Sequence, residues 1–185
     1  MKQKRVLYLA MVRSLFEHAS VIWHPIGVQI EKLEKIQKRS VKWILNEQDH
    51  HYNSYEYLKR LYDLKFLPLS SKFLYTDLLL FHKIFYDYSL IKMPCYITHA
   101  TDEDIQRLRS SRLDNLSLKC THPPRVQVFS DSYFQRTYLN WNRLPLSVRT
   151  VTDTTTFENK LVDHLWEELL EQPDPDDNEI GPEVF

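Results

Sequence analysis

The chain has 185 residues, of which 43% are hydrophobic, 26% charged and 13% aromatic, and its formal net charge is −1. This composition is that of a globular protein and excludes a wholly disordered or collagen-like chain. The only glycines are Gly27 and Gly181, which excludes glycine-rich nucleotide-binding loops and weighs against a turn-rich all-β fold. Two cysteines are too few for a disulfide scaffold, and no apolar run is long enough to cross a membrane. We therefore expect an intracellular protein, nuclear or cytoplasmic, with no membrane partner.

The small net charge hides a segregation of charge along the chain. Residues 1–72 contain 13 Lys and Arg against 7 Asp and Glu, and residues 105–150 contain 8 against 2. Residues 151–185 contain 1 against 11. Two basic blocks and an acidic end are typical of a protein that binds polyanions. Solvated helix faces followed by a solubilising tail would produce the same pattern.

Periodic apolar residues predict two helices near the N-terminus, over 5–23 and 28–46. The first carries Leu7, Met11, Leu15, Ala19 and Ile22 at helical spacing. The second has one apolar face and a basic stripe on its other side, formed by Lys32, Lys35, Lys38, Arg39 and Lys42. Glu31 and Glu34 each precede a lysine by four residues, so we expect pairs that partly neutralise the stripe.

Two further helices are predicted over 54–65 and 70–88. Ser54 is expected to cap the first of them, and its inward side chains are expected to be Tyr55, Leu58, Leu61 and Tyr62. The second has a broad apolar face that we expect to be core. That face is formed by Phe73, Leu74, Leu78, Phe81, Ile84, Phe85 and Tyr88.

Residues 89–130 lack a long periodic pattern and predict an irregular basic segment. Short strands are expected around Leu116–Leu118 and Val126–Val128. Helices are expected again over 131–142, capped by Ser130 or Asp131, and over 155–171, where Thr155 and Glu158 have capping-box spacing. The fold predicted is a mostly α bundle of about six helices. Its segments are a helical region (1–88), an irregular segment (89–130), a second helical region (131–171) and a disordered acidic tail (172–185).

Motifs for catalysis or metal binding are weak. Cys95, His99, Cys120 and His122 read C-x3-H-x20-C-x-H, and a single residue between the last two is awkward for ligands of one zinc ion. We expect ordinary surface residues there, and neither a metal nor a cofactor. The chain has no G-x-S-x-G, H-E-x-x-H or Walker sequence, so no small-molecule substrate is predicted.

Three stretches carry a resemblance to a known family. The first runs from Arg5 to Pro25 (RVLYLAMVRSLFEHASVIWHP) and continues through Ile30–Ser40 (IEKLEKIQKRS). The second runs from Tyr55 to Leu69 and ends in Leu-Pro-Leu. The third combines FSDSYF (129–134), WNRLP (141–145) and TF (156–157), which leads into KL (160–161). In order and spacing they resemble the region C-terminal to the palm in jockey-like non-LTR retrotransposon reverse transcriptases, over about residues 5–170.

The resemblance implies a thumb-like fragment of an RNA-directed DNA polymerase. Such polymerases carry an endonuclease and a palm with a Tyr/Phe-x-Asp-Asp motif, and no such motif occurs in this chain. We therefore expect no polymerisation by the chain alone, and Met1 is expected to be an internal start. The apolar face of residues 5–23 is expected to dock on the missing palm, and Trp23 and Trp141 are expected to pack in the core.

In this role, basic side chains would hold the backbone of RNA, DNA or an RNA–DNA hybrid without reading its sequence. The residues expected to do so are the basic stripe of Lys32, Lys35, Lys38, Arg39 and Lys42, and a second patch of Arg107, Arg109, Arg112 and Arg125. The alternative is a helical protein-interaction module, a domesticated or decayed remnant of a retroelement. It predicts an exposed apolar patch and no salt-dependent affinity for RNA.

Overall fold

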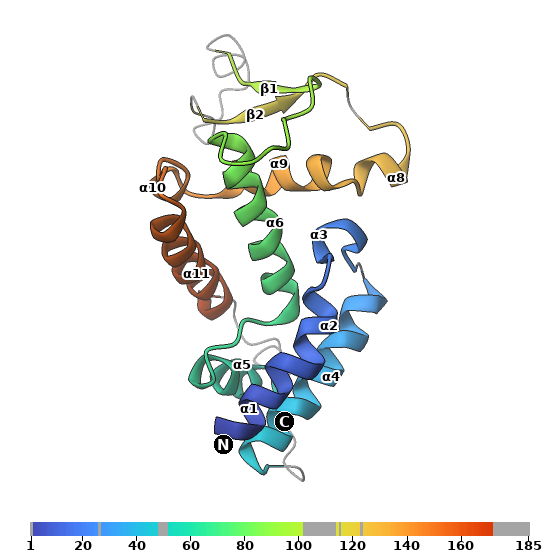
Figure 1. Cartoon of the computed structure of the whole chain (residues 1–185), viewed down its shortest axis with the longest axis vertical. Coiled ribbons are helices and arrows are strands. Elements are labelled where there is room, and N and C mark those ends of the chain that lie inside the picture. The colour runs from blue at the N-terminus through green and yellow to red at the C-terminus, as the bar shows by residue number, and fades with distance from the viewer. Residues whose placement is uncertain are drawn as a thin grey trace, which may run out of the picture. The chain divides into compact units, whose positions relative to one another are not determined.

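The computed structural model describes residues 2–25, 27–47, 52–101, 114, 116–122 and 124–171. They fall into two compact units, one that combines the described residues up to 73 with 164–171 and one that contains those from 74 to 163. The structure is mostly helical, and within the described ranges it has one two-stranded sheet, as predicted (Figure 1). Two long helices, α6 (Leu69–Phe85) and α11 (Thr154–Glu171), contribute residues to both units.

The first unit is built from short N-terminal helices and two longer ones. Its elements are α1 (Lys2–Leu7), the π-helical turn η1 (Tyr8–Arg13), α2 (Ser14–Glu17), α3 (Ser20–Trp23), α4 (Val28–Leu45) and α5 (Ser54–Asp63). The start of α6 and the end of α11 complete it. The predicted helices over 28–46 and 54–65 are thus confirmed within two residues.

The N-terminal run differs from the single helix predicted over 5–23. Ala19 has φ 54°, a left-handed conformation, and it separates α2 from α3. The π turn closes i→i+5 hydrogen bonds, which shifts the rotation of the side chains that follow it. Tyr8 and Arg13 are buried, whereas Met11 and Leu15 are 67% and 71% exposed. The residues at helical spacing therefore form an outward apolar face.

The core of the first unit gathers side chains from η1, α4 and α5. Tyr8, Val41, Ile44 and Leu61 are almost fully buried there. On α5 the inward tyrosine is Tyr57, while the predicted Tyr55 and Tyr62 are exposed. The cap of α5 is Asn53 and not Ser54, because Asn53 Oδ1 accepts from the Glu56 N–H at 2.7 Å and the Glu56 carboxylate accepts from the Asn53 N–H at 3.3 Å.

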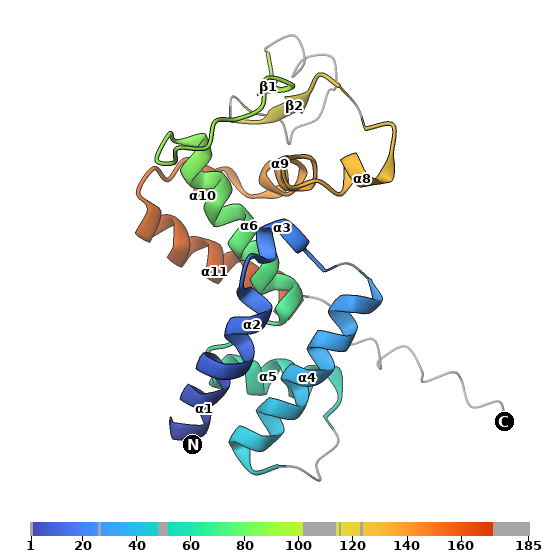
Figure 2. The same cartoon turned by 45° about the vertical axis from the view of Figure 1, so that its right-hand side comes forward.

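The second unit carries the sheet. It contains most of α6, β1 (Ile97–His99), β2 (Leu118–Cys120), α8 (Gln127–Ser130), α9 (Tyr133–Arg143), α10 (Leu146–Arg149) and the start of α11. The strands are antiparallel, with Ile97 opposite Cys120, and Figures 1 and 2 show them above α9. A strand at Leu118 was predicted, but it pairs with the strand Ile97–His99, in which His99 lies opposite Leu118. The Val126–Val128 strand was wrong, because Val126 precedes α8 and Val128 lies within it, both exposed.

Aromatic side chains fill the core of the second unit. Trp141 is fully buried, as predicted, and its ring lies 4.9 Å from that of Phe85 and 5.5 Å from that of Phe81. His82, also fully buried, stacks on Phe157 at 4.1 Å. Tyr88, predicted to share this face of α6, lies past the end of the helix and is exposed.

Helix caps in this unit differ from the predicted ones. The N-cap of α9 is Ser132 rather than Ser130 or Asp131. At the start of α11, Asp153 Oδ2 accepts from the Thr156 N–H at 2.8 Å, so Asp153 takes the capping role predicted for Thr155. The hydrogen bonds to Thr156 lower the pKa of the Asp153 carboxyl, as expected for a cap that works as an anion.

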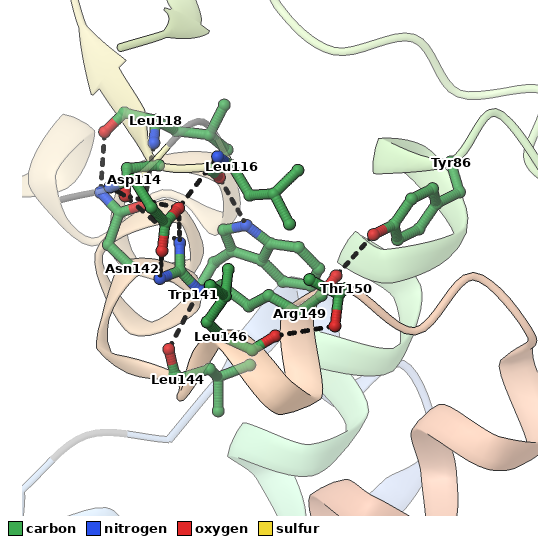
Figure 3. A network of polar contacts seen from close by, with 11 residues as sticks. Tyr86, Asp114, Leu116, Leu118, Trp141, Asn142, Leu144, Leu146, Arg149 and Thr150 are labelled. Atoms are coloured by element: carbon green, nitrogen blue, oxygen red, sulfur yellow. Dashed lines mark hydrogen bonds and ion pairs between the residues drawn. The ribbon is translucent and has the colours of Figure 1, made fainter. Parts of the chain in front are cut away.

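A polar network joins β2 to α9 and α10 (Figure 3). The Arg149 side chain is 3% exposed, and its Nη2 lies 2.5 Å from Asp114 Oδ2 while its Nε donates to the Leu144 carbonyl at 2.9 Å. Asn142 holds the strand by accepting from the Leu118 N–H and donating to the Leu118 carbonyl, at 2.9 and 2.7 Å. The partners of Arg149 and Asn142 all lie in neighbouring parts of the same unit. The buried charge of Arg149 therefore stabilises the fold.

Candidate nucleic-acid interface

The predicted basic stripe lies on α4. This helix begins after Gly27, whose φ of +55° favours glycine, and it ends at Asn46 in the left-handed conformation. Its inner face is marked by Gln37, Val41 and Ile44, all fully buried. Because side chains advance about 100° per residue around an α-helix, the opposite side is left to the basic residues.

A buried glutamine fixes the rotation of α4. Gln37 Oε1 accepts from the Tyr8 hydroxyl at 2.9 Å, and Gln37 Nε2 donates to the Leu67 carbonyl at 3.1 Å. Burial raises the pKa of the Tyr8 hydroxyl, so it remains a protonated donor. An unpaired amide in this core would cost about 1–3 kcal/mol. These bonds therefore favour one rotation of the helix over all others.

Glu34 is a second anchor of α4. Its carboxylate accepts from the Tyr57 hydroxyl at 2.6 Å and from the Leu69 N–H at 2.8 Å. Burial raises the pKa of the Tyr57 hydroxyl, and the nearby Glu34 charge adds to this shift. The carboxylate thus ties α4 to α5 and to the start of α6. The predicted pairing of Glu34 with Lys38 gives way to these bonds.

Two of the five cations in the basic stripe serve the fold. Lys38 Nζ donates to the Tyr52 carbonyl at 3.0 Å and lies 5.4 Å from the centre of the Tyr57 ring. Lys42 Nζ lies 5.3 Å from the centre of the Tyr52 ring. Both side chains are half-buried, and each contacts the segment that leads into α5. Their charges are therefore only partly open to an external ligand.

The other three cations, Lys32, Lys35 and Arg39, are exposed. They stand at i, i+3 and i+7, so they lie along one side of the helix. At 1.5 Å per residue, Lys32 and Arg39 are separated by about 10 Å along the axis. A duplex presents one phosphate per strand about every 3.4 Å of its axis. The three cations can therefore meet about three phosphates of one strand.

Exposed apolar side chains border these cations, a feature that the charge pattern did not reveal. Ile36 and Trp43 are 39% and 37% exposed, and helical spacing places them beside Lys32 and Arg39. Lys4 from α1 lies over the Trp43 ring at 5.0 Å and donates to the Trp43 carbonyl at 2.9 Å. The position of Trp43 on the helical wheel could have suggested this border, but the approach of Lys4 depends on tertiary contacts.

Of the second predicted patch, only Arg125 lies within the described residues. Arg125 is exposed and lines a shallow pocket with Thr121, His122, Val126 and Phe129. Arg107, Arg109 and Arg112 lie outside the described residues. Arg125 belongs to the second unit, whereas α4 belongs to the first. Trp23, expected in the core, is 42% exposed, although its ring packs edge-on against Phe73 at 5.7 Å.

The candidate zinc residues contact other protein groups. Cys120 Sγ donates to the His122 carbonyl at 2.9 Å, and both cysteines are free thiols. Within the described ranges, no three His, Cys, Asp or Glu side chains are gathered closely enough to hold a metal ion. Across those same ranges, no helix combines the length and the apolar character needed to span a membrane.

Comparison with family models, with curated proteins and with solved structures finds no match to this chain.

Proposed function

We propose that this chain is the thumb-like C-terminal region of a non-LTR retroelement reverse transcriptase and that α4 holds the backbone of a template–primer duplex. The observation that carries the proposal is the row of three exposed cations on α4, Lys32, Lys35 and Arg39. Contacts to phosphates position a duplex without reading its sequence, which is what a polymerase needs as it slides. The assignment to a retroelement family is inferred from the sequence resemblance. Polymerisation itself is assigned to the parent enzyme and not to this chain.

The binding experiment is a salt titration. Fluorescence anisotropy of a labelled RNA–DNA hybrid with the full chain should give a log–log salt slope near −3, at about 0.9 per phosphate contact. Affinity would then fall about 40-fold between 50 and 200 mM salt. The triple variant K32Q/K35Q/R39Q should bind weakly and with a nearly flat slope. The matched variant K59Q/K65Q/R143Q removes three exposed cations from other surfaces and should keep the slope.

Two results would overturn the proposal. A folded, monodisperse chain that shows no binding at 50 mM salt has no nucleic-acid role of this kind. Equal slopes for the two triple variants would show that α4 is not the contact surface. Circular dichroism of all variants should be unchanged, because each substituted side chain is exposed.

A second candidate, a protein-interaction module, is favoured by a different observation. Leu7, Met11 and Leu15 are 49%, 67% and 71% exposed and follow one another at intervals of four residues. Exposed apolar patches often mark protein interfaces. In the proposed reverse transcriptase this face would dock on the palm, whereas in the alternative it would be the main functional surface. The alternative would be favoured if the chain binds a protein partner in a way that is insensitive to salt and abolished by L15E, and if it has no affinity for the hybrid.

A further inference from the structure

An apolar groove opens in the first unit beside the basic stripe of α4. Its volume is about 330 Å³, and its walls come from α4, α5, the start of α6 and the last turns of α11. Ile30, Tyr57 and Leu58 give it an apolar lining, Lys38 stands where the groove meets the stripe, and Leu169 comes from α11. The end of α11 therefore lies at the edge of the surface proposed for nucleic acid.

The surface of α4 changes in a fixed order around the helix axis. At about 100° per residue, the groove side, with Glu34 and Lys38, is followed by Lys35, Arg39 and Lys32. The exposed apolar border of Ile36 and Trp43 comes next. A chain that crosses the helix from the groove would thus meet an apolar, then a basic, then an apolar surface.

The segment that follows α11 has the complementary order. After Leu169 and Leu170, residues 172–185 first bring four of their five acidic residues, at 174, 176, 177 and 179, and no Lys or Arg. The apolar Ile180, Val184 and Phe185 come last, with Glu183 among them. Apolar, acidic and apolar positions in the chain match apolar, basic and apolar surfaces on α4.

The length of the segment is sufficient for this contact. Fourteen residues span at most about 46 Å at 3.3 Å each, whereas the 18 residues of α4 extend over about 27 Å. Tethering raises the effective concentration of a segment to the millimolar range, so individually weak ion pairs are enough to populate the contact. Glu31 also borders the groove, and its charge opposes the approach of the acidic residues on that side.

We propose that residues 172–185 lie across the basic stripe of α4 and compete there with nucleic acid. The contact itself needs no nucleic acid, whereas its regulatory consequence rests on the proposed function. A duplex would have to displace the segment, which lowers its apparent affinity by the fraction of molecules in which the stripe is free. With an effective concentration of a few millimolar and a millimolar affinity for the contact, the loss is about 3- to 10-fold at low salt.

The first test uses the full chain without nucleic acid. Backbone amide shifts of α4 are compared at 50 mM salt between the wild type and D174N/D176N/D177N/E179Q/E183Q. We expect differences along Lys32–Lys42 that collapse at 500 mM salt, where exposed ion pairs are screened. The matched control, D174E/D176E/D177E/E179D/E183D, replaces each Asp by Glu and each Glu by Asp and so keeps the charge. Its amide shifts along α4 should equal those of the wild type. The variant I180S/V184S/F185S should shift the amides around Ile36 and Trp43.

The second test measures affinity for the labelled hybrid at 50 mM salt. The neutralised variant should bind about 3- to 10-fold more tightly than the wild type, and the charge-keeping variant should not. If α4 shifts but no protein binds the hybrid, the contact stands and the nucleic-acid function fails. If affinity rises without any shift on α4, the acidic residues act by repulsion at a distance and the contact is refuted. Unchanged shifts with unchanged affinity refute it as well.

Discussion

His82 should make the second unit sensitive to acid. Its ring is fully buried, its Nε2 lies 2.7 Å from the Val151 carbonyl, and its Nδ1 has no hydrogen-bond partner. Nε2 therefore carries the proton of a neutral ring, and burial lowers the pKa of His82. The perturbation to test is His82→Gln, because glutamine offers an N–H donor toward Val151 but cannot take up a proton.

The size of the effect follows from proton linkage. A histidine in the unfolded chain has a pKa near 6.5, so below that pH the unfolded state binds a proton that folded His82 refuses. Stability is therefore complete above pH 6.5 and falls as the pH drops toward the lowered pKa of the folded state. The loss is at most about 1.4 kcal/mol between pH 7.5 and 5.5. In H82Q this pH-dependent loss of stability is absent. The missing stacking on Phe157 instead lowers the free energy of unfolding by about 0.5–1.5 kcal/mol at every pH.

Urea unfolding followed by tryptophan fluorescence and far-UV circular dichroism measures both quantities. Wild type and H82Q are compared at pH 7.5 and pH 5.5, so that the other histidines contribute equally to both proteins. We expect the difference in unfolding free energy between the two proteins to shrink by about 1 kcal/mol at the lower pH. Parallel pH dependences would contradict this prediction, as would an NMR titration in which His82 becomes protonated near pH 6.5.

Three further predictions test the packing. Asp114→Asn leaves the buried Arg149 guanidinium without its counter-ion and should cost about 3–5 kcal/mol in urea unfolding; a loss below 1 kcal/mol would contradict the burial. Asn53→Ala should cost about 1 kcal/mol by removing the cap of α5, whereas Ser54→Ala should cost less than half of that. The double variant M11S/L15S should change the free energy of unfolding by less than about 0.5 kcal/mol, because both side chains are exposed; a large loss would place them in the core.

Long helices with one clear apolar face could be predicted from the sequence because their local pattern and their packing agree. The helix over 28–46 is the example, since Val41 and Ile44 are buried where the periodicity places them. The N-terminal run shows the limit. A π turn at Tyr8–Arg13 and a left-handed Ala19 change the rotation of the side chains around the helix axis within this run. The residue types at these positions indicate neither feature. The burial of Arg13 could not be predicted from a period of 3.6.

Caps and strands required knowledge of neighbours that spacing does not provide. Asn53 and Ser54 are both good cap residues, and only the reach of Glu56 back to the Asn53 N–H decides between them. A strand at Leu118 was suggested by its apolar neighbours. The residue opposite Leu118 is His99, which lies 19 positions earlier in the chain. Pairing over such a separation is set by tertiary packing and not by local preference.

The same limit decides how the basic stripe of α4 should be interpreted. Charge patterning gives five cations equal weight, but a cation is available to phosphate only if the fold does not use it. Lys38 and Lys42 contact Tyr52, and Lys38 also contacts Tyr57, so two of the five charges already help to position α5. The remaining three can neutralise about three phosphates, which is why the expected salt slope is near −3 and not near −5. A slope near −5 would mean that Lys38 and Lys42 leave their aromatic partners when nucleic acid binds, and the segment that leads into α5 would then have to rearrange with them.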